Sequence, residues 1–487
     1  MTPVTSLWLT LALPLVGAAL IVLLDRRPNQ REAVTLLTAG LLFGLVVRLW
    51  FAARAGEWPA LVLVETLPGL PLALKVEPLG MLFALVASLL WIVTSLYSIG
   101  YMRAHHEKNQ TRFYAAFAVA LASTMGVAFA ANMFTLFVCY EVLTLSTYPL
   151  VTHSGTEEAR RAGRVYLGLL LGTSIGLQLL AIIWTWALVG TLDFRQGGIL
   201  ADVASPTVIG VLYALYVFGI GKAALMPFHR WLPAAMVAPT PVSALLHAVA
   251  VVKAGVFTIL KVSVYLFGID LIAGNGTTGW LLYVAGATIL VASLVAMAQD
   301  NLKARLAYST VSQLGYVVLG AVLANAWGVI GGAMHIAMHA FGKITLFFCA
   351  GAILVATHKT EVSQMRGLGR AMPITMGAFF IASLSIIGLP PMGGLWSKWY
   401  LALGTLDAGQ LALLAVLMVS SLLNIAYLLP IPIRAFFLEP EPNERSKGIR
   451  EAPLPCLAAI VFTALACLAL FFYPEPLYEL ASMLVIL

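Results

Sequence analysis

The chain has 487 residues, of which 61% are hydrophobic and only 10% are charged. A soluble protein needs more polar surface than this composition supplies. The net charge of +7 does not indicate nucleic acid, because the basic residues lie between long apolar blocks. The composition excludes a water-soluble globular protein and favours an integral membrane protein.

Apolar blocks follow one another along the whole sequence. A helix needs about 20 apolar residues to cross a hydrocarbon core of about 30 Å, whereas the strands of a membrane β-barrel would alternate in short segments. Since the first block is followed by thirteen others, we interpret it as a span and not as a cleaved signal peptide. The sequence predicts an all-α integral membrane protein with about 14 transmembrane helices. The blocks are 4–24, 33–52, 78–100, 113–131, 133–152, 165–190, 207–226, 240–267, 279–298, 306–324, 327–356, 372–404, 409–433 and 454–473.

The basic residues alternate from one connecting loop to the next. Nineteen Lys and Arg residues follow odd-numbered blocks, and three, Arg54, Lys75 and Arg195, follow even-numbered blocks. Cytoplasmic loops of membrane proteins are enriched in Lys and Arg. We therefore expect a multi-pass protein of a prokaryotic plasma (inner) membrane with both termini on the non-cytoplasmic side.

A small set of ionisable residues remains inside the apolar blocks. Each such group costs roughly a few kcal/mol in hydrocarbon, and it usually faces the bundle interior and marks an ion path. We expect Arg48 and Lys261 instead to snorkel toward the interface. The other members of the set are the candidates for proton translocation: Glu141, Lys222, Lys253, His247, His335, His339, Lys343 and Lys398.

The spacing of three candidates is typical of a relay. His335, His339 and Lys343 lie four residues apart, so they share one face of a helix. A single buried histidine is more often a satisfied core residue, but an aligned set of this kind favours proton transfer. Burial stabilises the neutral amine of a lysine, and histidine titrates near neutral pH. Ser243, one turn before His247, is expected to orient its ring.

Helix breakers lie beside two of the lysines. Pro227 follows Lys222, and Pro390 and Pro391 precede Lys398. Proline inside a span frees backbone groups that must find partners in protein or water, and broken helices at matching places indicate a transport site. The breaks in spans 7 and 12 predict two inverted five-helix repeats, although kinks made only for packing would give a similar pattern. The expected organisation is 1–110 for spans 1–3, 111–268 for the first repeat, 279–438 for the second repeat and 451–487 for span 14.

The sequence shows no pattern for redox or catalytic chemistry. The four cysteines all lie inside spans, without a CxxC pair or a Cys/His cluster, and are interpreted as buried hydrophobes. A phosphate-binding glycine loop and a nucleophile–base pattern are also missing from the sequence. We expect no cofactor, no metal site and no enzymatic activity in the isolated chain. The cysteines are Cys139, Cys349, Cys456 and Cys467.

Several longer motifs resemble the antiporter-like subunit family. This family comprises proton-pumping membrane subunits of respiratory complex I (NADH:quinone oxidoreductase), subunits of Mrp-type cation/proton antiporters, and their counterparts in membrane-bound hydrogenases. The resemblance covers nearly the whole chain. The motifs are PFHRWLPA at 227–234, APTPVSALLH at 238–247, VVKAG at 251–255, DNLKARLAYSTVSQLG at 300–315, and the segment 335–343.

The resemblance implies roles for the candidate residues. Glu141 is similar to the family's glutamate of span 5 and Lys222 to its partner in span 7. Lys253 resembles the central lysine of span 8, and Lys398 the terminal residue of span 12, which is lysine or glutamate in complex I subunits. The span-11 relay of the family corresponds to His335, His339 and Lys343.

The resemblance also implies partners. Members work beside other membrane subunits, including related antiporter-like subunits, in the lipid bilayer. The length of the chain and the lysine at 398 resemble the Mrp-type antiporter component known as MrpD, whereas the motifs around Pro239 and Ser309 resemble larger members that continue into extra spans. Assignments to complex I and to hydrogenases therefore stay open. Sodium prefers several hard oxygen ligands, so any sodium path is expected mainly in another subunit.

Two functions of other classes compete with a proton-translocating subunit. A stand-alone secondary transporter for an organic substrate would need a roomy cavity at mid-membrane depth. A structural scaffold would use the buried charges only to hold helices together. One mid-span carboxylate cannot neutralise four or five lysines, which argues against a scaffold of ion pairs.

Overall fold

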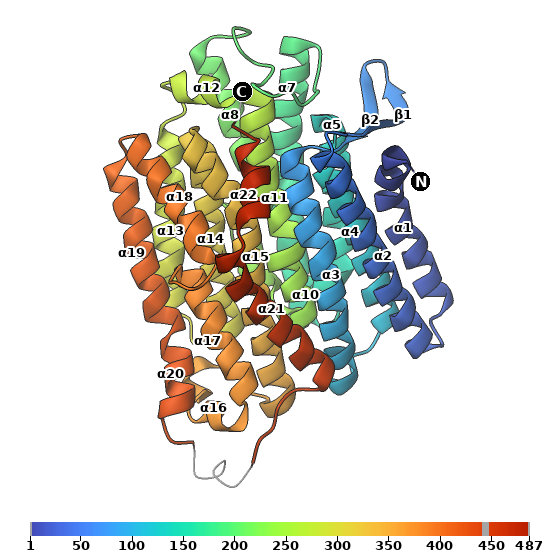
Figure 1. Ribbon diagram of the computed structural model, residues 1–487, viewed down its shortest axis with the longest axis vertical. Helices are drawn as coiled ribbons and strands as arrows, with labels where there is room; N and C mark the ends of the chain where they lie inside the picture. Colours follow the sequence, from blue (N-terminus) through green and yellow to red (C-terminus); the bar gives the residue numbers. More distant parts are fainter. Residues whose placement is uncertain (1, 441–447, 486–487) are drawn as a thin grey trace.

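The chain folds into a bundle of long helices that run in one general direction (Figure 1). The computed structural model describes residues 2–440 and 448–485. Within these residues, 12 helices are long and apolar enough to cross a membrane, and two further apolar helices, Pro206–Gly219 and Pro373–Ile387, are shorter. The predicted all-α integral membrane fold is confirmed, while the count of 14 spans and the inverted repeats stay predictions. Arg445 and Lys447, which belong to the loop charge count, lie outside the described residues.

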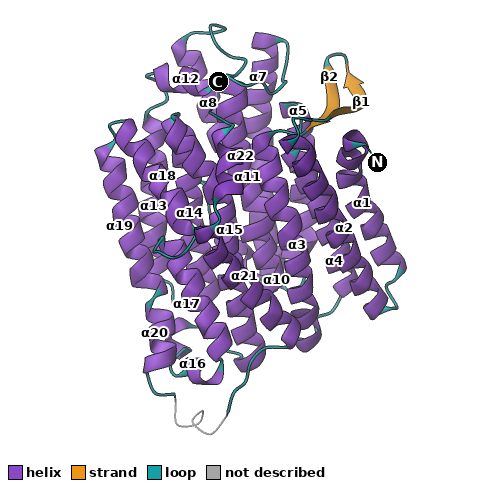
Figure 2. Cartoon of the chain, viewed as in Figure 1, coloured by secondary structure: helices purple, strands orange, loops and turns teal. Residues whose placement is uncertain are grey.

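The first three spans carry a β-hairpin that the sequence analysis did not anticipate (Figure 2). Two runs of β-branched and aliphatic residues flank Pro68 and Gly69, a pairing typical of a turn between strands. The hairpin is tied to the helices, because the Lys75 N–H donates to the Phe129 carbonyl at 2.7 Å. The elements are α1 (Pro3–Leu23), α2 (Pro28–Arg54), β1 (Ala60–Leu67), β2 (Leu70–Lys75), antiparallel to β1, and α3 (Pro78–Ala104).

The next segment leads to the first helix break. Asn132 and Thr156 begin two of its helices as N-caps, with side chains that accept from backbone N–H groups, which satisfies donors that a helix start leaves open. The elements are α4 (Gln110–Ala128), α5 (Met133–Val151), α6 (Glu157–Thr173), the π-helical turn η1 (Ser174–Gln178), α7 (Leu179–Val189) and α8 (Pro206–Gly219).

After α8 the chain runs through short turns before the central span forms. This span is interrupted by π-helical turns, and it lies wholly inside the protein: all of its most apolar 18-residue window is buried. The elements are η2 (Gly221–Ala223), α9 (Trp231–Ala234), η3 (Ala235–Val237), α10 (Thr240–Ala244), η4 (Leu245–Val249), α11 (Val251–Lys261), η5 (Val262–Phe267) and α12 (Ile269–Gly274).

The second half contains the longest helix and the second break. Helix α15 has 32 residues, and α17 and α18 form one interrupted span. The elements are α13 (Trp280–Ala298), α14 (Leu302–Leu323), α15 (Ala326–Thr357), η6 (Val362–Gln364), α16 (Leu368–Ala371), α17 (Pro373–Ile387), α18 (Gly394–Asp407), α19 (Leu411–Leu428), α20 (Pro430–Phe437), α21 (Leu454–Phe472) and α22 (Glu475–Ser482).

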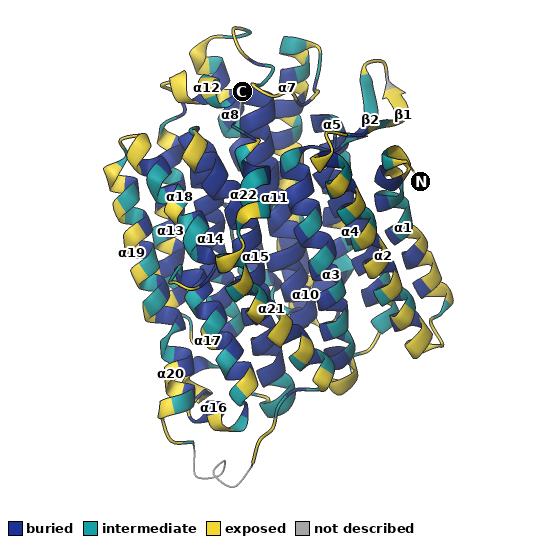
Figure 3. Ribbon diagram, in the orientation of Figure 1, coloured by how far each residue is buried: buried dark blue, intermediate teal, exposed yellow. Residues whose placement is uncertain are grey.

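Burial separates a central set of helices from an outer set (Figure 3). The most apolar window is 94% buried in α14 but only 39% and 33% buried in α1 and α2. The outer helices expose apolar side chains such as Leu23 and Leu37, as surfaces in contact with lipid do. Both ends of the described chain lie toward the hairpin in Figure 1, at what we call the hairpin end, and α20 lies at the opposite end.

Candidate functional site

Lys222 lies in the first helix break. Helix α8 ends at Gly219, and the short turn η2 turns the lysine toward α5. Its buried Nζ donates to the Tyr140 carbonyl at 2.8 Å and to Thr144 Oγ1 at 2.6 Å, and it lies 3.1 Å from the centroid of the Tyr140 ring. The break is closed on its other side by Trp231, whose Nε1 donates to the Gly221 carbonyl at 3.0 Å. Backbone groups freed by the break therefore have protein partners, as a membrane interior requires.

Glu141 lies beside this lysine but is not paired with it. It follows Tyr140 on α5, and both carboxylate oxygens are buried without a hydrogen-bond partner in the described protein. Among the described residues, Glu141 is in no ion pair within 4.0 Å. The structure thus brings the two predicted partners onto neighbouring positions, with the ammonium of Lys222 bonded to α5 itself. An unpaired carboxylate in such a place is costly.

Lys253 connects the two halves of the molecule. It lies on α11, where Gly255 permits close contact with the first break: a Cβ there would lie 2.3 Å from the Lys222 carbonyl carbon. The buried Lys253 Nζ is hydrogen-bonded to His339 Nδ1 on α15. The ring of His339 stacks against that of His335 with centroids 5.6 Å apart. The lysine from the first half therefore contacts the histidines of the second.

The histidine pair continues to the second helix break. His335 Nδ1 lies 2.8 Å from Ser397 Oγ on α18, next to Lys398. The Lys398 Nζ donates to the Ile387 carbonyl at the end of α17, at 3.0 Å, and to Ser421 Oγ at 3.2 Å. This lysine satisfies a carbonyl freed by the break. A close sequence of contacts thus runs from Lys253 through both histidines to the neighbourhood of Lys398.

The phenol of Tyr316 adds a second contact between these residues. Its ring stacks on His335 at 5.5 Å and lies 4.9 Å from Lys398 Nζ. Sequence reasoning did not select Tyr316 or Ser397. A lone tyrosine in an apolar span gives no signal of its partners, and a lone serine usually bonds a carbonyl of its own helix. Their role depends on neighbours that come from distant parts of the chain.

We call the series Lys253, His339, His335 and Lys398 the row. Lys343 and His247 lie beside it. The Lys343 Nζ donates to Ser309 Oγ at 2.6 Å, and Tyr427 donates to the same oxygen at 2.8 Å. His247 packs on Phe347 with ring centroids 4.6 Å apart. Both of its ring nitrogens, and the hydroxyl of Ser243, have no hydrogen-bond partner in the described protein. The expectation that Ser243 orients His247 is therefore wrong, since the π-helical turn η4 shifts the two side chains out of the usual one-turn spacing.

Other buried polar atoms near the row also have no protein partner. They belong to the same central helices and to η1 and α19. Buried polar groups are normally hydrogen-bonded, so these atoms are exceptions within the described protein. The atoms are His335 Nε2, His339 Nε2, Gln313 Nε2 and Oε1, Gln178 Nε2 and Oε1, and Asn424 Nδ2.

Lys261 overturns an expectation of the sequence analysis. Its side chain does not snorkel: it is fully buried, donates to the Ala130 carbonyl at 2.7 Å and lies 3.1 Å from Glu77 Oε2. Glu77 is the N-cap residue of α3, and the sequence analysis did not select it. Lys75, the last residue of β2, lies 3.7 Å from Glu77 Oε1. Arg48, the other residue expected to snorkel, is exposed on α2.

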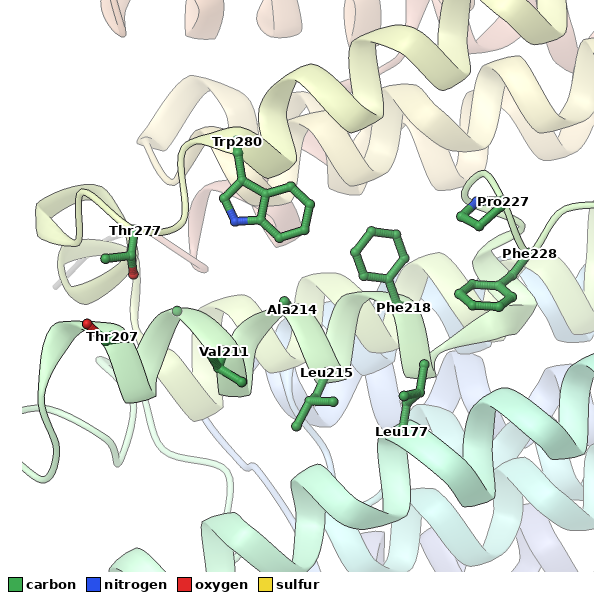
Figure 4. A pocket seen from close by; sticks show the side chains of 11 residues that line it. Leu177, Thr207, Val211, Ala214, Leu215, Phe218, Pro227, Phe228, Thr277 and Trp280 are labelled. Carbon is green, nitrogen blue, oxygen red and sulfur yellow. The ribbon is translucent and has the colours of Figure 1, made fainter.

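An apolar groove lies beside the first break, next to Pro227 (Figure 4). Its volume is about 490 Å³, and Phe218, Phe228 and Trp280 are among its lining residues. No ionisable side chain lines it, so it does not provide the charged mid-membrane cavity that a carrier of polar organic substrates would need. Among the described residues, no three His, Cys, Asp or Glu side chains converge as metal ligands do.

These features define a class: a multi-pass membrane protein with a buried lysine at the first helix break, a half-buried lysine at the second, and histidines between them. The family model described as NADH:quinone oxidoreductase/Mrp antiporter, TM matches residues 130–424. NADH-quinone oxidoreductase subunit N of Desulforudis audaxviator is 37% identical over 391 residues, covering 78% of this chain and 75% of that protein. The chain belongs to this family of antiporter-like membrane subunits, and the predicted resemblance is confirmed.

Other relatives show how widely the family is distributed among complexes. Hydrogenase-4 component B of Escherichia coli is 33% identical over 346 residues, covering 68% of this chain but only 50% of that protein. The fold is shared with a chain of the Mrp complex from Dietzia sp. DQ12-45-1b, with a TM-score of 0.88, 24% identity and coverage of 100% and 97% of the two chains. At this level of identity the second comparison shows the fold alone.

Proposed function

We propose that this chain translocates protons across the membrane along its buried lysines and histidines. One observation carries the proposal: Lys253, His339 and His335 form a contact series that joins the two broken spans. Buried ionisable groups are expensive in a bilayer, and a series of basic groups without counter-ions is best explained by protons that are held transiently. The residues proposed to carry protons are Glu141, Lys222, Lys253, His247, His335, His339, Lys343 and Lys398, and Pro227, Pro390 and Pro391 are proposed to maintain the breaks.

The geometry suggests how the row is charged and discharged. Lys222 is held by neutral oxygens of Tyr140 and Thr144, and an ammonium in that place is not neutralised by its contacts. Movement of Glu141 toward it would stabilise the ammonium, and separation would drive the proton onward. Lys253 and His339 share one hydrogen bond, so either nitrogen is able to hold the proton between them.

We further propose that the chain works as a subunit of a multi-subunit monovalent cation/proton antiporter, similar to the MrpD component of Mrp-type complexes. The similarity in fold and length to a chain of an Mrp complex supports this assignment. The 37% identity to a subunit N supports the alternative, a proton-pumping subunit of an NADH:quinone oxidoreductase or a related hydrogenase. In either case the partners are other membrane subunits, and any redox chemistry takes place on them.

A substitution of Lys253 tests proton translocation. Lys253→Met keeps the length of the side chain and removes its charge and hydrogen bond. In inverted vesicles containing the whole complex, we expect proton movement per assembled complex to fall at least about tenfold, since a series path fails when one carrier is missing. Arg48→Met is the matched control, because Arg48 is an ionisable span residue on the outer surface. Normal proton movement in Lys253→Met would contradict the proposal.

The orientation in the membrane is proposed from the loop charges. Both termini and the hairpin are placed on the non-cytoplasmic side of a prokaryotic plasma membrane, and the connection after α20 on the cytoplasmic side. Small tags at Met1 and Leu487 should be accessible from outside intact cells, and a tag at Pro440 should not. Opposite accessibility of the two termini would overturn this orientation.

A further inference from the structure

Glu77 and Lys261 form a buried ion pair at the hairpin end, apart from the row described above. Their side chains are 5% and 0% exposed, and Nζ lies 3.1 Å from Oε2. The lysine also donates to the Ala130 carbonyl at 2.7 Å, and its Nζ lies 4.6 Å from the centroid of the Phe194 ring. Desolvating two charges is costly and is only partly offset by their attraction. A pair placed there for packing alone would be an expensive substitute for apolar residues.

The hairpin builds this site. Lys75, the last residue of β2, lies 3.7 Å from Glu77 Oε1 and is 44% exposed. The strand is fixed to the α4–α5 connection through the bond between the Lys75 N–H and the Phe129 carbonyl. The neighbouring Ala130 supplies the carbonyl that holds Lys261. One carboxylate is thus placed between a buried lysine and an exposed one.

A hollow leads from this carboxylate to the surface. Its volume is about 390 Å³, and Lys75, Glu77, Phe194 and Tyr265 are among its lining residues. Trp58 of the segment before β1 and Met483 after α22 close its rim. The hollow has room for several water molecules, and it reaches the surface at the hairpin end, where the exposed Lys75 stands.

Lys261 belongs to the same helix as the central lysine. Lys253 and Lys261 are both on α11, and eight residues of helix correspond to about 12 Å along the axis. The ionisable groups that face the pair within the described residues are Lys75, on one side, and Tyr265, on the lining of the hollow. Along α11, the pair therefore lies between Lys253 and the hollow at the hairpin end.

We propose that Glu77 and Lys261 form the port through which protons pass between the buried row and the water at the hairpin end. In the outward direction, an N–H bond of the Lys261 ammonium breaks and an O–H bond forms on Glu77, which then gives the proton to water in the hollow. The reverse steps load the row. The positive charge of Lys75 favours the ionised carboxylate and so assists release to water. This port rests on the proposed function, since it serves the same proton path.

A double neutral variant separates this role from a structural one. Glu77→Gln together with Lys261→Met removes both charges at once, so that no unpaired buried charge destabilises the protein. For a port, proton movement per assembled complex falls at least about tenfold while the amount of complex is retained. The matched control is Arg54→Met with Glu479→Gln, which removes an exposed ion pair of 3.8 Å at the same end and should leave proton movement unchanged.

Access from the hairpin end is tested independently of transport. A cysteine in Glu77→Cys should react with a charged, membrane-impermeant thiol reagent added from that side to the assembled complex. The buried native Cys349 and Cys467 are internal controls that should not react. An unreactive Glu77→Cys, or a double neutral variant with normal proton movement, overturns the port.

The outcomes distinguish the port from the wider function. If Lys253→Met stops proton movement and the double neutral variant does not, the port alone is wrong. If neither variant affects proton movement, proton translocation by this chain is wrong as well.

Discussion

Each of the two helix breaks contains a lysine, but the two lysines differ in their hydrogen-bond partners and in the ionisable groups near them. At the first break, Lys222 bonds oxygens of α5, and the free carboxylate of Glu141 lies on the same helix. At the second, the bonds of Lys398 are to the Ile387 carbonyl and Ser421, and the neighbouring Ser397 and Tyr316 lead to His335. The first lysine has a potential counter-ion and no direct contact to the histidines. The second has no ion pair within 4.0 Å among the described residues, and it is linked to His335 only through Ser397 and Tyr316.

Under the proposed function, we infer distinct tasks for the two halves. A carboxylate that approaches or leaves a lysine changes the free energy of its ammonium by several kcal/mol, so the first break is suited to set the charge state of the row. His339 is hydrogen-bonded to Lys253 and His335 to Ser397, and under the same proposal the second half passes the proton on. Substitutions at the two breaks should therefore differ in how strongly they reduce proton movement.

The largest effect is expected at the first break. Glu141→Gln and Lys222→Met should each reduce proton movement at least about tenfold, because each removes one member of the pair that sets the charge. The double variant should be no worse than either single one, since residues that act as a unit are not additive. Proton movement is measured in vesicles and normalised to assembled complex.

A contrary result would have a clear meaning. Normal transport in Glu141→Gln would show that the unpaired carboxylate does not drive the row, and the two halves would then not differ as proposed. A loss of assembled complex in both variants would instead indicate that the pair has a structural role.

The second break should be more tolerant of a change in chemistry. Lys398→Ala is expected to lower proton movement strongly, because it removes the donor to Ile387 as well as the proton carrier. Lys398→Glu should retain a measurable part of it, since a carboxylate still accepts and releases a proton. Equal loss in the two variants would show that the positive charge itself is required.

The close helix contacts at the breaks should respond to a single methyl group. A Cβ at Gly394 would lie 1.9 Å from the Ser385 carbonyl oxygen, and one at Gly255 would lie 2.3 Å from the Lys222 carbonyl carbon. Gly255→Ala and Gly394→Ala should each lower transport several-fold by displacing a lysine-bearing segment. Gly377→Ala is the control, because nothing lies within 4 Å of that position. Unchanged transport in both test variants would show that the breaks tolerate displacement.

The smallest effect is expected far from both breaks, at His153 in the loop after α5. Burial, and then the nearby Arg112, lower the pKa of His153, while Glu107 opposes the shift. The unfolded chain therefore takes up this proton before the folded one, so stability is greatest above about pH 6.5 and falls as the pH drops through that value. His153→Gln should reduce this acid loss, which we expect to be about one or two degrees in the melting temperature. An unchanged pH profile would show that the group does not contribute.

Several parts of the site were predictable because local patterns carry them. The i, i+4 spacing placed His335, His339 and Lys343 on one face of one helix, and the structure has them buried on α15. The prolines and glycines beside Lys222 and Lys398 indicated the breaks. The hairpin between α2 and α3 was missed, because a short pair of apolar strands resembles a membrane-adjacent loop in a sequence dominated by spans.

The sequence by itself determined that the chain lies in the membrane, which residues are ionisable within it, and where its helices are interrupted. These features depend on composition and local spacing, and the cost of polar groups in lipid leaves few alternatives. The tertiary structure alone decided that Lys253 meets His339, that Glu141 lies beside Lys222 without an ion pair to it, and that Lys261 is buried against Glu77 instead of reaching the surface. Those outcomes depend on contacts between segments as far apart as α3 and α11, whose relative placement is set by the packing of the whole bundle.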